Sequence, residues 1–219
     1  IGDVLILRLE LKYTLQFRKI QTLLLQSPTM KRNIIENKIF HQLDYGNTPL
    51  EFGEYEECKF SNCDFSNSDL SNFNFSECSF DDCNLSMVNL SKTSLKTVAF
   101  KNCKLLGIHF DACNEFLLSV SFHHCTLNFS SFYKLNLRKT KFIHCSLQEV
   151  DFTEANLTQA IFDSCDLSGT IFDNTLLESA DLRTSQNYSI DPESNYLRKA
   201  RFSSDGLAGL LHKYDLSIE

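Results

Sequence analysis

Residues 58–85 read CKFSNCDFSNSDLSNFNFSECSFDDCNL, and every fifth residue from Phe60 onward in this stretch is Phe or Leu. The same spacing runs through residues 40–110 and, after a shift of frame, through residues 117–182, with Leu, Phe or Tyr at each step. Neither the 3.6-residue period of a helix nor the two-residue period of a strand produces it. A repeat of this length decides the architecture before other signals are weighed.

Each unit also has a small or apolar residue two positions before its large one, such as Cys58 before Phe60. Residues two apart in extended backbone point to the same side, so each unit is a short extended side with two inward side chains and a polar corner. One such side cannot bury its own apolar pair. The sides must therefore wind and stack into a solenoid. A turn of twenty residues would stack Cys63, Cys83 and Cys103 directly above one another.

Units such as Cys63-Asp64-Phe65, Ala155-Asn156-Leu157 and Ala180-Asp181-Leu182 resemble the A-(D/N)-L-x-x signature of pentapeptide-repeat proteins. This resemblance implies an all-β fold, a right-handed quadrilateral β-helix with four repeats per coil. The length of the repeat region predicts about seven coils, stacked at ~4.8 Å per layer.

We expect three parts along the chain. Residues 1–29 do not fit the repeat, and we interpret them as an extension that adds little to function; the alternative is a cap over the first coil. Residues 30–182 form the β-helix. In residues 183–219 a polar connector leads to a short helix, capped by Ser203 or Ser204, and then to a terminal strand.

This small C-terminal helix-strand module carries more apolar surface than it can bury alone. It resembles the dimerisation segment of the quinolone-resistance (Qnr-type) and gyrase-protecting members of the family, and the resemblance implies a homodimer. The alternative is a cap folded onto its own last coil. The expected interface residues are Leu207, Leu210, Leu211, Tyr214, Leu216 and Ile218.

The formal charge of −7 is unevenly distributed. Residues 50–91 contain nine acids and one base, residues 92–141 contain eight bases and two acids, and residues 142–182 contain eight acids and no base. A rod of carboxylates can attract the basic groove of a DNA-binding protein. The resemblance implies such DNA mimicry toward DNA gyrase or topoisomerase IV. The expected contact residues are Glu77, Asp81, Asp82, Glu149, Asp151, Glu154, Asp163, Asp166, Asp173, Glu178 and Asp181.

Three alternatives stay open: the acids merely keep a solenoid surface polar, the rod is a structural adaptor for an unrelated protein partner, or the protein is a rare modifying enzyme with its site at the exposed end. The basic belt at residues 92–141 interrupts the acidic field and argues against mimicry. So does the small size of the irregularity at residues 111–116, a two-residue insertion where Qnr-type proteins carry projecting loops. We expect no direct nucleic-acid binding, because the belt lacks stacked exposed aromatic residues.

Nothing in the sequence predicts catalysis, a cofactor or a metal. A nucleophile needs an adjacent base and an orienting group, whereas His109, His123, His124 and His144 all take outward positions of the repeat. His124 and His144, twenty residues apart, are expected to lie side by side on one face.

Eight of the nine cysteines fall at the small inward position, Cys113 being the exception, so we interpret them as core residues. A redox or metal role is the alternative. Reduced thiols favour a cytoplasmic protein. No apolar run reaches the length that spans a membrane.

Overall fold

The computed structural model describes residues 33–217. Contacts group the chain into two compact units, Ile1–Asn33 and Ile34–Glu219, and the described residues belong almost entirely to the second. The region 1–29, interpreted above as an extension, lies outside the described residues.

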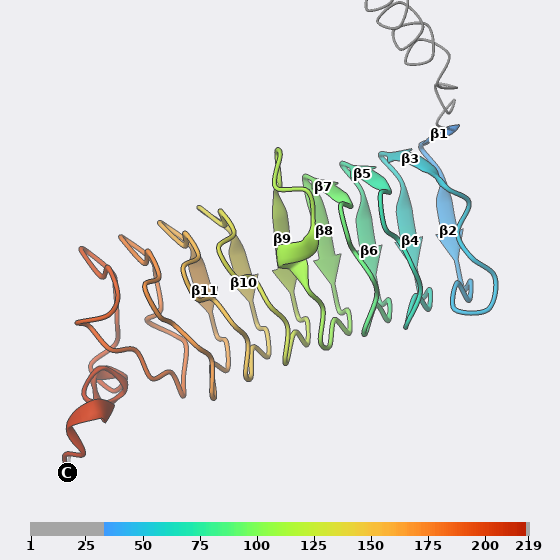
Figure 1. Ribbon diagram of the computed structural model, residues 1–219. Helices are drawn as coiled ribbons and strands as arrows, with labels where there is room; N and C mark the ends of the chain where they lie inside the picture. The colour runs from blue at the N-terminus through green and yellow to red at the C-terminus, as the bar shows by residue number, and fades with distance from the viewer. Residues whose placement is uncertain (1–32, 218–219) are drawn as a thin grey trace, which may run out of the picture. The chain divides into compact units, whose positions relative to one another are not determined.

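The second unit is a β-solenoid of parallel strands with about seven turns, which confirms the fold predicted from the repeat (Figure 1). We number its sides in the order in which the chain passes them from β2 onward. The first side is a parallel sheet in the order β11-β10-β9-β8-β6-β4-β2. Its strands are β2 (Ile39–His41), β4 (Lys59–Ser61), β6 (Ser79–Asp81), β8 (Val98–Lys101), β9 (Val120–His123), β10 (Lys141–Ile143) and β11 (Ile161–Asp163).

The fourth side begins as a second parallel sheet, in the order β1-β3-β5-β7. Its strands are β1 (Asn33–Glu36), β3 (Gly53–Glu56), β5 (Asn74–Ser76) and β7 (Ser94–Lys96). The other two sides are joined by isolated parallel bridges. The second side includes the bridges from Asp64 to Asn84 and from Ser146 to Asp166, and the third side includes the bridge from Ser131 to Asp151.

The large inward residues form vertical columns, as the five-residue period predicts. Phe142 pairs in register with Phe122 in the coil before it and with Phe162 in the coil after it. The three rings are stacked, with centroids 5.2 and 5.0 Å apart and interplanar angles of 9° and 5°. All three side chains are fully buried.

The small inward position has a second task that the spacing alone does not reveal. Its thiols and hydroxyls donate hydrogen bonds to carbonyl groups of the preceding coil, as in Cys103 to Phe80 (3.3 Å) and Thr93 to Leu70 (2.6 Å). Each bond satisfies a buried donor, which would otherwise destabilise the core. All nine cysteines are free and buried, including Cys113. Burial raises the pKa of the Cys78 thiol to about 11, so this thiol is neutral at physiological pH.

The corners are built from left-handed residues. The residue two positions after each large one has a positive φ in most units, for example 53° at Asn62 and Glu77. Its N–H group then donates to the next coil, as in the bond from Asn62 to the carbonyl of Asp81 (3.0 Å). Asn tolerates this conformation better than most residues, which explains the many Asn residues at these corners.

The two extra residues lie later than the sequence indicates. Asn114 still pairs with Ser94, twenty residues earlier, but the N–H group of Ser119 donates to the carbonyl of Leu95. The insertion therefore falls between Asn114 and Ser119. Leu117, predicted as an inward residue, is 63 % exposed, and Leu118 packs partly against the core in its place. The prediction was wrong because the frame shifts after Asn114 rather than before it.

The ladder continues beyond the predicted end at Leu182, because Leu176 pairs with Tyr196 and Asp181 pairs with Arg201. The expected C-terminal helix is instead two short 3-10 helices, η2 (Leu207–Leu210) and η3 (His212–Tyr214). A third, η1 (Phe110–Ala112), lies next to the insertion. The Ser203 hydroxyl accepts the N–H group of Gly206 (3.1 Å), but residues 215–217 contain no strand.

Candidate partner-binding surface

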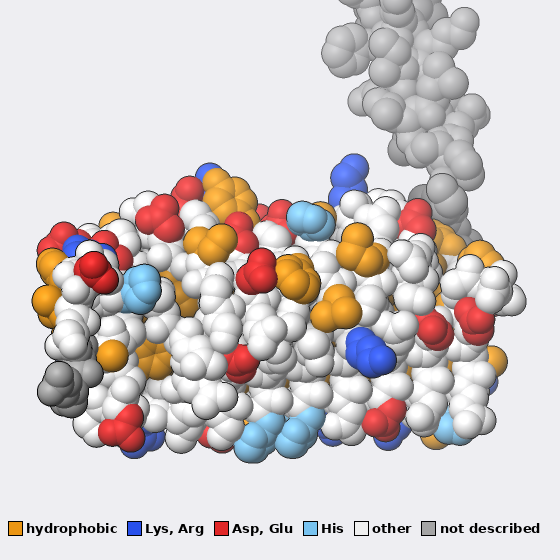
Figure 2. Space-filling view, turned by 90° about the horizontal axis from the view of Figure 1, so that it is seen from below, with side chains coloured by type: hydrophobic (Ala, Val, Ile, Leu, Met, Phe, Trp, Pro, Cys, Tyr) orange, Lys and Arg blue, Asp and Glu red, His pale blue; other side chains and the backbone are white. Residues whose placement is uncertain are grey.

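The interior is filled by stacked Phe and Leu side chains, so any contact with a partner must use the outward positions. The eleven predicted acidic residues occupy all four sides of the coil rather than one. The first side carries Asp81, Asp82, Asp163 and Asp181; the second Glu149 and Asp166; the third Asp151, Glu154 and Asp173; and the fourth Glu77 and Glu178. On the face seen in Figure 2, acidic, basic and hydrophobic side chains are interspersed.

Three of these acids stabilise turns of the coil itself. An Asp or Asn that precedes a large inward residue accepts the N–H group two residues ahead, as Asp151 does from Thr153 (2.8 Å) and Asp181 from Arg183 (3.3 Å). At Asp166 burial opposes ionisation, but hydrogen bonds from Ser168, Gln148 and Asn187 outweigh it and lower the pKa to about 2. These carboxylates are held as structural acceptors.

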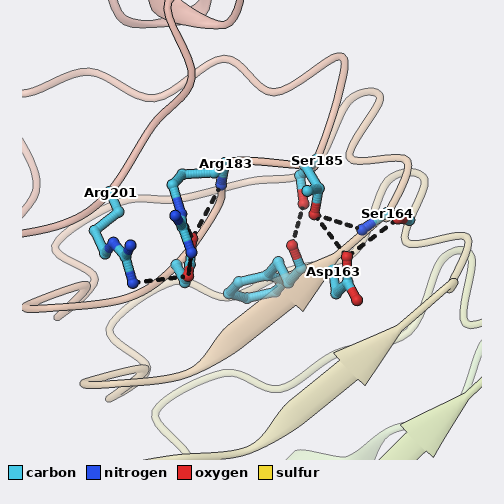
Figure 3. A network of polar contacts seen from close by, with 8 residues as sticks. Asp163, Ser164, Arg183, Ser185 and Arg201 are labelled. Atoms are coloured by element: carbon cyan, nitrogen blue, oxygen red, sulfur yellow. Dashed lines mark hydrogen bonds and ion pairs between the residues drawn. The ribbon is translucent and has the colours of Figure 1, made fainter.

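Arginines of the last coil neutralise the C-terminal part of the acidic surface. Arg183 and Arg201 converge on the carboxylate of Asp181, at 2.8 and 3.3 Å (Figure 3). Arg198 pairs with Glu178 at 3.2 Å. The hydrogen bond from Arg183 is the main reason that the pKa of Asp181 is lowered.

Three further predicted acids have local partners. Lys59 pairs with Asp81 (2.6 Å), and Lys134 pairs with Glu154 (3.4 Å). Asp163 accepts hydrogen bonds from the hydroxyl of Ser164 in its own coil (3.1 Å) and from the hydroxyl of Thr184 in the next coil (2.8 Å) (Figure 3).

Four predicted acids make neither an ion pair nor a side-chain hydrogen bond with another residue of the described range 33–217: Glu77, Asp82, Glu149 and Asp173. Of these, Glu77 lies near two other acidic residues on the fourth side. Glu57 occupies the corner one coil earlier, where its N–H group donates to Ser76 (3.0 Å), and Glu56 precedes it in β3. Sequence reasoning left Glu56 and Glu57 out of the predicted surface, although their position twenty residues before Ser76 and Glu77 was readable from the repeat. We call Glu56, Glu57 and Glu77 the acidic corner.

The family model described as "Pentapeptide repeat region" matches residues 54–115 and 116–189, well over half of the chain. The chain belongs to the pentapeptide-repeat family. No curated protein matches it in sequence.

Solved pentapeptide-repeat structures share the fold. A trypsin-treated form of QnrB1, described as a plasmid-mediated fluoroquinolone resistance protein, is 16 % identical, with a TM-score of 0.55; the match covers 85 % of this chain and 100 % of that one. HetL, described as involved in heterocyst differentiation regulation in the cyanobacterium Nostoc, is 17 % identical, with a TM-score of 0.52; the match covers 83 % of this chain and 92 % of that one. At these identities the likeness concerns the fold alone.

The basic belt of this pentapeptide-repeat coil carries exposed aromatic residues, although no two of them stack on each other in the described part of the chain. Phe116, Phe129 and Tyr133 are all solvent-exposed, and the ammonium group of Lys134 lies 4.7 Å from the ring centre of Tyr133. Phe116 belongs to the insertion and Phe129 occupies a corner, and the expectation of no direct nucleic-acid binding stays a prediction.

The rings of His124 and His144 stack at 4.7 Å with an interplanar angle of 8°, as expected from their twenty-residue separation. Within the described residues, no group of three or more His, Cys, Asp or Glu side chains is placed to hold a metal ion. Nor does this part of the pentapeptide-repeat chain contain a helix long and apolar enough to cross a bilayer.

Proposed function

We propose that this chain is a non-catalytic binding scaffold that docks a protein partner on the outside of its coil. The observation that carries this proposal is that the inward and outward positions of each repeat have different roles. Inward positions are occupied by the stacked core and by donors to the ladder, whereas outward positions differ in charge from coil to coil. A solenoid of this kind offers an extended, rigid surface for recognition. The free buried thiols support the cytoplasm as the compartment.

For the partner we propose a type II topoisomerase, DNA gyrase or topoisomerase IV, which would meet carboxylates in place of DNA phosphates. Two observations support this choice: the fold shared with a fluoroquinolone resistance protein, and the acidic corner. Glu57 and Glu77 project from successive layers of one edge, so their charges repeat at the layer spacing of ~4.8 Å. The C-terminal acids contribute less, since Arg198 and Arg201 neutralise Glu178 and Asp181.

A supercoiling assay with purified gyrase, with and without a fluoroquinolone, tests this proposal. The wild-type protein should inhibit supercoiling or protect the enzyme. The double variant Glu57→Gln/Glu77→Gln should need a concentration higher by roughly tenfold for the same effect, because complementary charges steer association. Glu178→Gln is the control, since Arg198 already neutralises this acid on the same side. Wild-type protein without effect at micromolar concentration and low salt would refute the choice of topoisomerase.

A structural or adaptor role with an unrelated partner is the second candidate. The belt at residues 92–141 favours it, because a positive band in the middle of the coil opposes a partner whose groove is itself positive. If this candidate is right, the protein has no effect in the supercoiling assay. The proposal of a protein-binding scaffold is not contradicted by that result.

We further propose that two copies associate through their C-terminal segments. Leu207, Leu211, Tyr214 and Leu216 are exposed, whereas Leu210 packs partly against its own coil; Ile218 lies outside the described residues. Lys213 bridges Asp191 (2.8 Å) and Glu193 (2.6 Å), and the hydroxyl of Tyr214 donates to Glu193 (3.1 Å). The segment is thus docked on the last coil and presents its remaining apolar side chains outward.

Leu211→Asp should convert the dimer into a monomer, because a carboxylate buried in an apolar interface is left without a partner. Light scattering measures the molar mass directly. The matched control is Met87→Asp, which changes an exposed apolar residue on the second side, far from the C-terminal segment. A dimer that persists in Leu211→Asp places the interface elsewhere.

A further inference from the structure

We propose that the fourth side carries a second docking surface, which accepts an acidic protein segment with apolar side chains between its acids. It consists of the insertion loop, residues 115–118, and the basic side chains in the coils on either side of it. This surface goes beyond the proposed contact with a topoisomerase, since its charge is opposite to that of the acidic corner.

The insertion loop presents two large apolar side chains from a fixed base. Ser94 pairs with Asn114 before it, and the bond from Ser119 to Leu95 (3.0 Å) closes it. The N–H group of Phe116 donates to the side chain of Asn114 (3.0 Å), which orients the outgoing backbone. Phe116 is 69 % exposed, and Leu117, at φ 60°, is 63 % exposed. In Figure 1 the stretch leading into β9 extends beyond the corners of the neighbouring coils.

Leu117 has the left-handed conformation of the other corners, twenty residues after Thr97 (φ 56°). Its side chain stays outside because Leu118 supplies the inward contact. Two exposed apolar residues on an anchored loop offer a contact for apolar side chains of a partner.

Basic side chains surround this loop. Lys96 lies in the coil before it, and Arg138 and Lys139 lie in the coil after it; Lys92 and Lys141 occupy the neighbouring edges. None of the five forms an ion pair with another residue in the described part of the chain. The sixth base of the group, Lys134, pairs with Glu154. Within the loop, Glu115 is the one carboxylate. The surface is therefore strongly positive and its charges are available.

The length of this positive surface favours a protein segment over a nucleic acid. From Lys92 to Lys141 it covers about three layers, roughly 10–15 Å at ~4.8 Å per layer. The acidic corner bounds it on one side, because the N–H group of Glu77 donates to the carbonyl of Lys96. A nucleic acid carries a phosphate charge every few ångströms and would continue into these acids. An acidic segment whose apolar side chains pack against Phe116 and Leu117 matches both the charge and the apolar residues of the loop.

Fluorescence anisotropy at low salt tests the proposal with a defined probe, a labelled short peptide that alternates Glu with Leu and Phe. The full chain should bind this peptide, and binding should weaken as salt is raised. Lys96→Glu/Arg138→Glu should weaken it by tenfold or more. The control Lys101→Glu/Lys104→Glu makes the same charge change on the first and second sides and should alter binding less than twofold.

Two further measurements are needed. One separates the contribution of the apolar contact from that of the charges, and the other compares an acidic peptide with a nucleic acid as the ligand. Phe116→Ser/Leu117→Ser should weaken binding of the apolar acidic peptide, but not of a peptide in which Ser replaces Leu and Phe. A labelled single-stranded oligothymidylate serves as the competing polyanion. The proposal is overturned if the peptide does not bind, if both charge reversals act alike, or if the oligonucleotide binds more tightly through Lys96 and Arg138. None of these variants touches Glu57 or Glu77, so the topoisomerase proposal is tested independently.

Discussion

Phe142→Ala is expected to lower the free energy of unfolding by about 3–5 kcal/mol. The Phe142 ring is fully buried and stacks between Phe122 and Phe162. It also makes edge contacts with Phe132 (6.0 Å) and Phe152 (5.8 Å). The cavity cannot close by collapse, because the ladder hydrogen bonds on all four sides fix the distance between coils. The lost contacts are therefore not replaced.

Urea unfolding followed by circular dichroism measures this loss. Phe129→Ala is the matched control: it removes the same ring from an exposed corner, and it should cost less than about 1 kcal/mol. Equal midpoints for the wild type and Phe142→Ala would mean that the phenylalanine column does not support the coil.

The core was predictable from sequence because a single geometric requirement recurs in every repeat. A large side chain at each fifth position must point inward, so the spacing alone places Phe60, Phe80 and Phe100 in one column. The register confirms this column. The left-handed corner was not predictable in the same way. Residues as different as Asn62, Glu77 and His124 adopt it, since the ladder rather than residue preference imposes it.

The frame of the insertion could not be decided from sequence. Both Leu117 and Leu118 are apolar, and either could supply the inward residue; only the pairing of Asn114 with Ser94 settles the choice. The last coil was missed for a related reason. Its buried residues include Tyr188, Ile190 and a polar one, Asn195, which depart from the Leu and Phe pattern, and the pattern returns only at Leu197 and Phe202.

The net charge of a stretch of sequence does not predict the net charge of one side of the coil, as the acidic residues show. Residues five apart stand on adjacent sides of a four-sided coil, so a run of acids is distributed around the axis. The neighbours that matter are twenty residues away. Arg198 and Arg201, outside the window in which the acids were counted, reach Glu178 and Asp181 for this reason.

Asn195→Leu is expected to lower the stability of the last coil by about 2–4 kcal/mol, because it leaves two buried backbone groups without partners. The side chain of Asn195 is buried and acts as a clamp. Its carbonyl oxygen accepts the N–H group of Thr175 (2.9 Å), and its amide donates to the carbonyls of Phe172 (3.0 Å) and Asp191 (3.0 Å). Leucine has a similar volume, so the loss reports the hydrogen bonds rather than a cavity.

The effect should be local, since each coil of a solenoid contacts only its neighbours. Amide hydrogen exchange should accelerate at Thr175 and at Leu177, whose N–H group donates to Tyr196 (3.0 Å), while the amide of Phe122 stays protected. Trypsin should cut sooner at Arg198 and Lys199 in the opened coil. Asn136→Leu is the control. It makes the same change at an exposed position, where the side chain accepts one long hydrogen bond from the N–H group of Arg138 (3.4 Å). It should leave both hydrogen exchange and trypsin cleavage unchanged. If exchange at Thr175 is equally slow in Asn195→Leu, the last coil is held by its ladder alone and the clamp is dispensable.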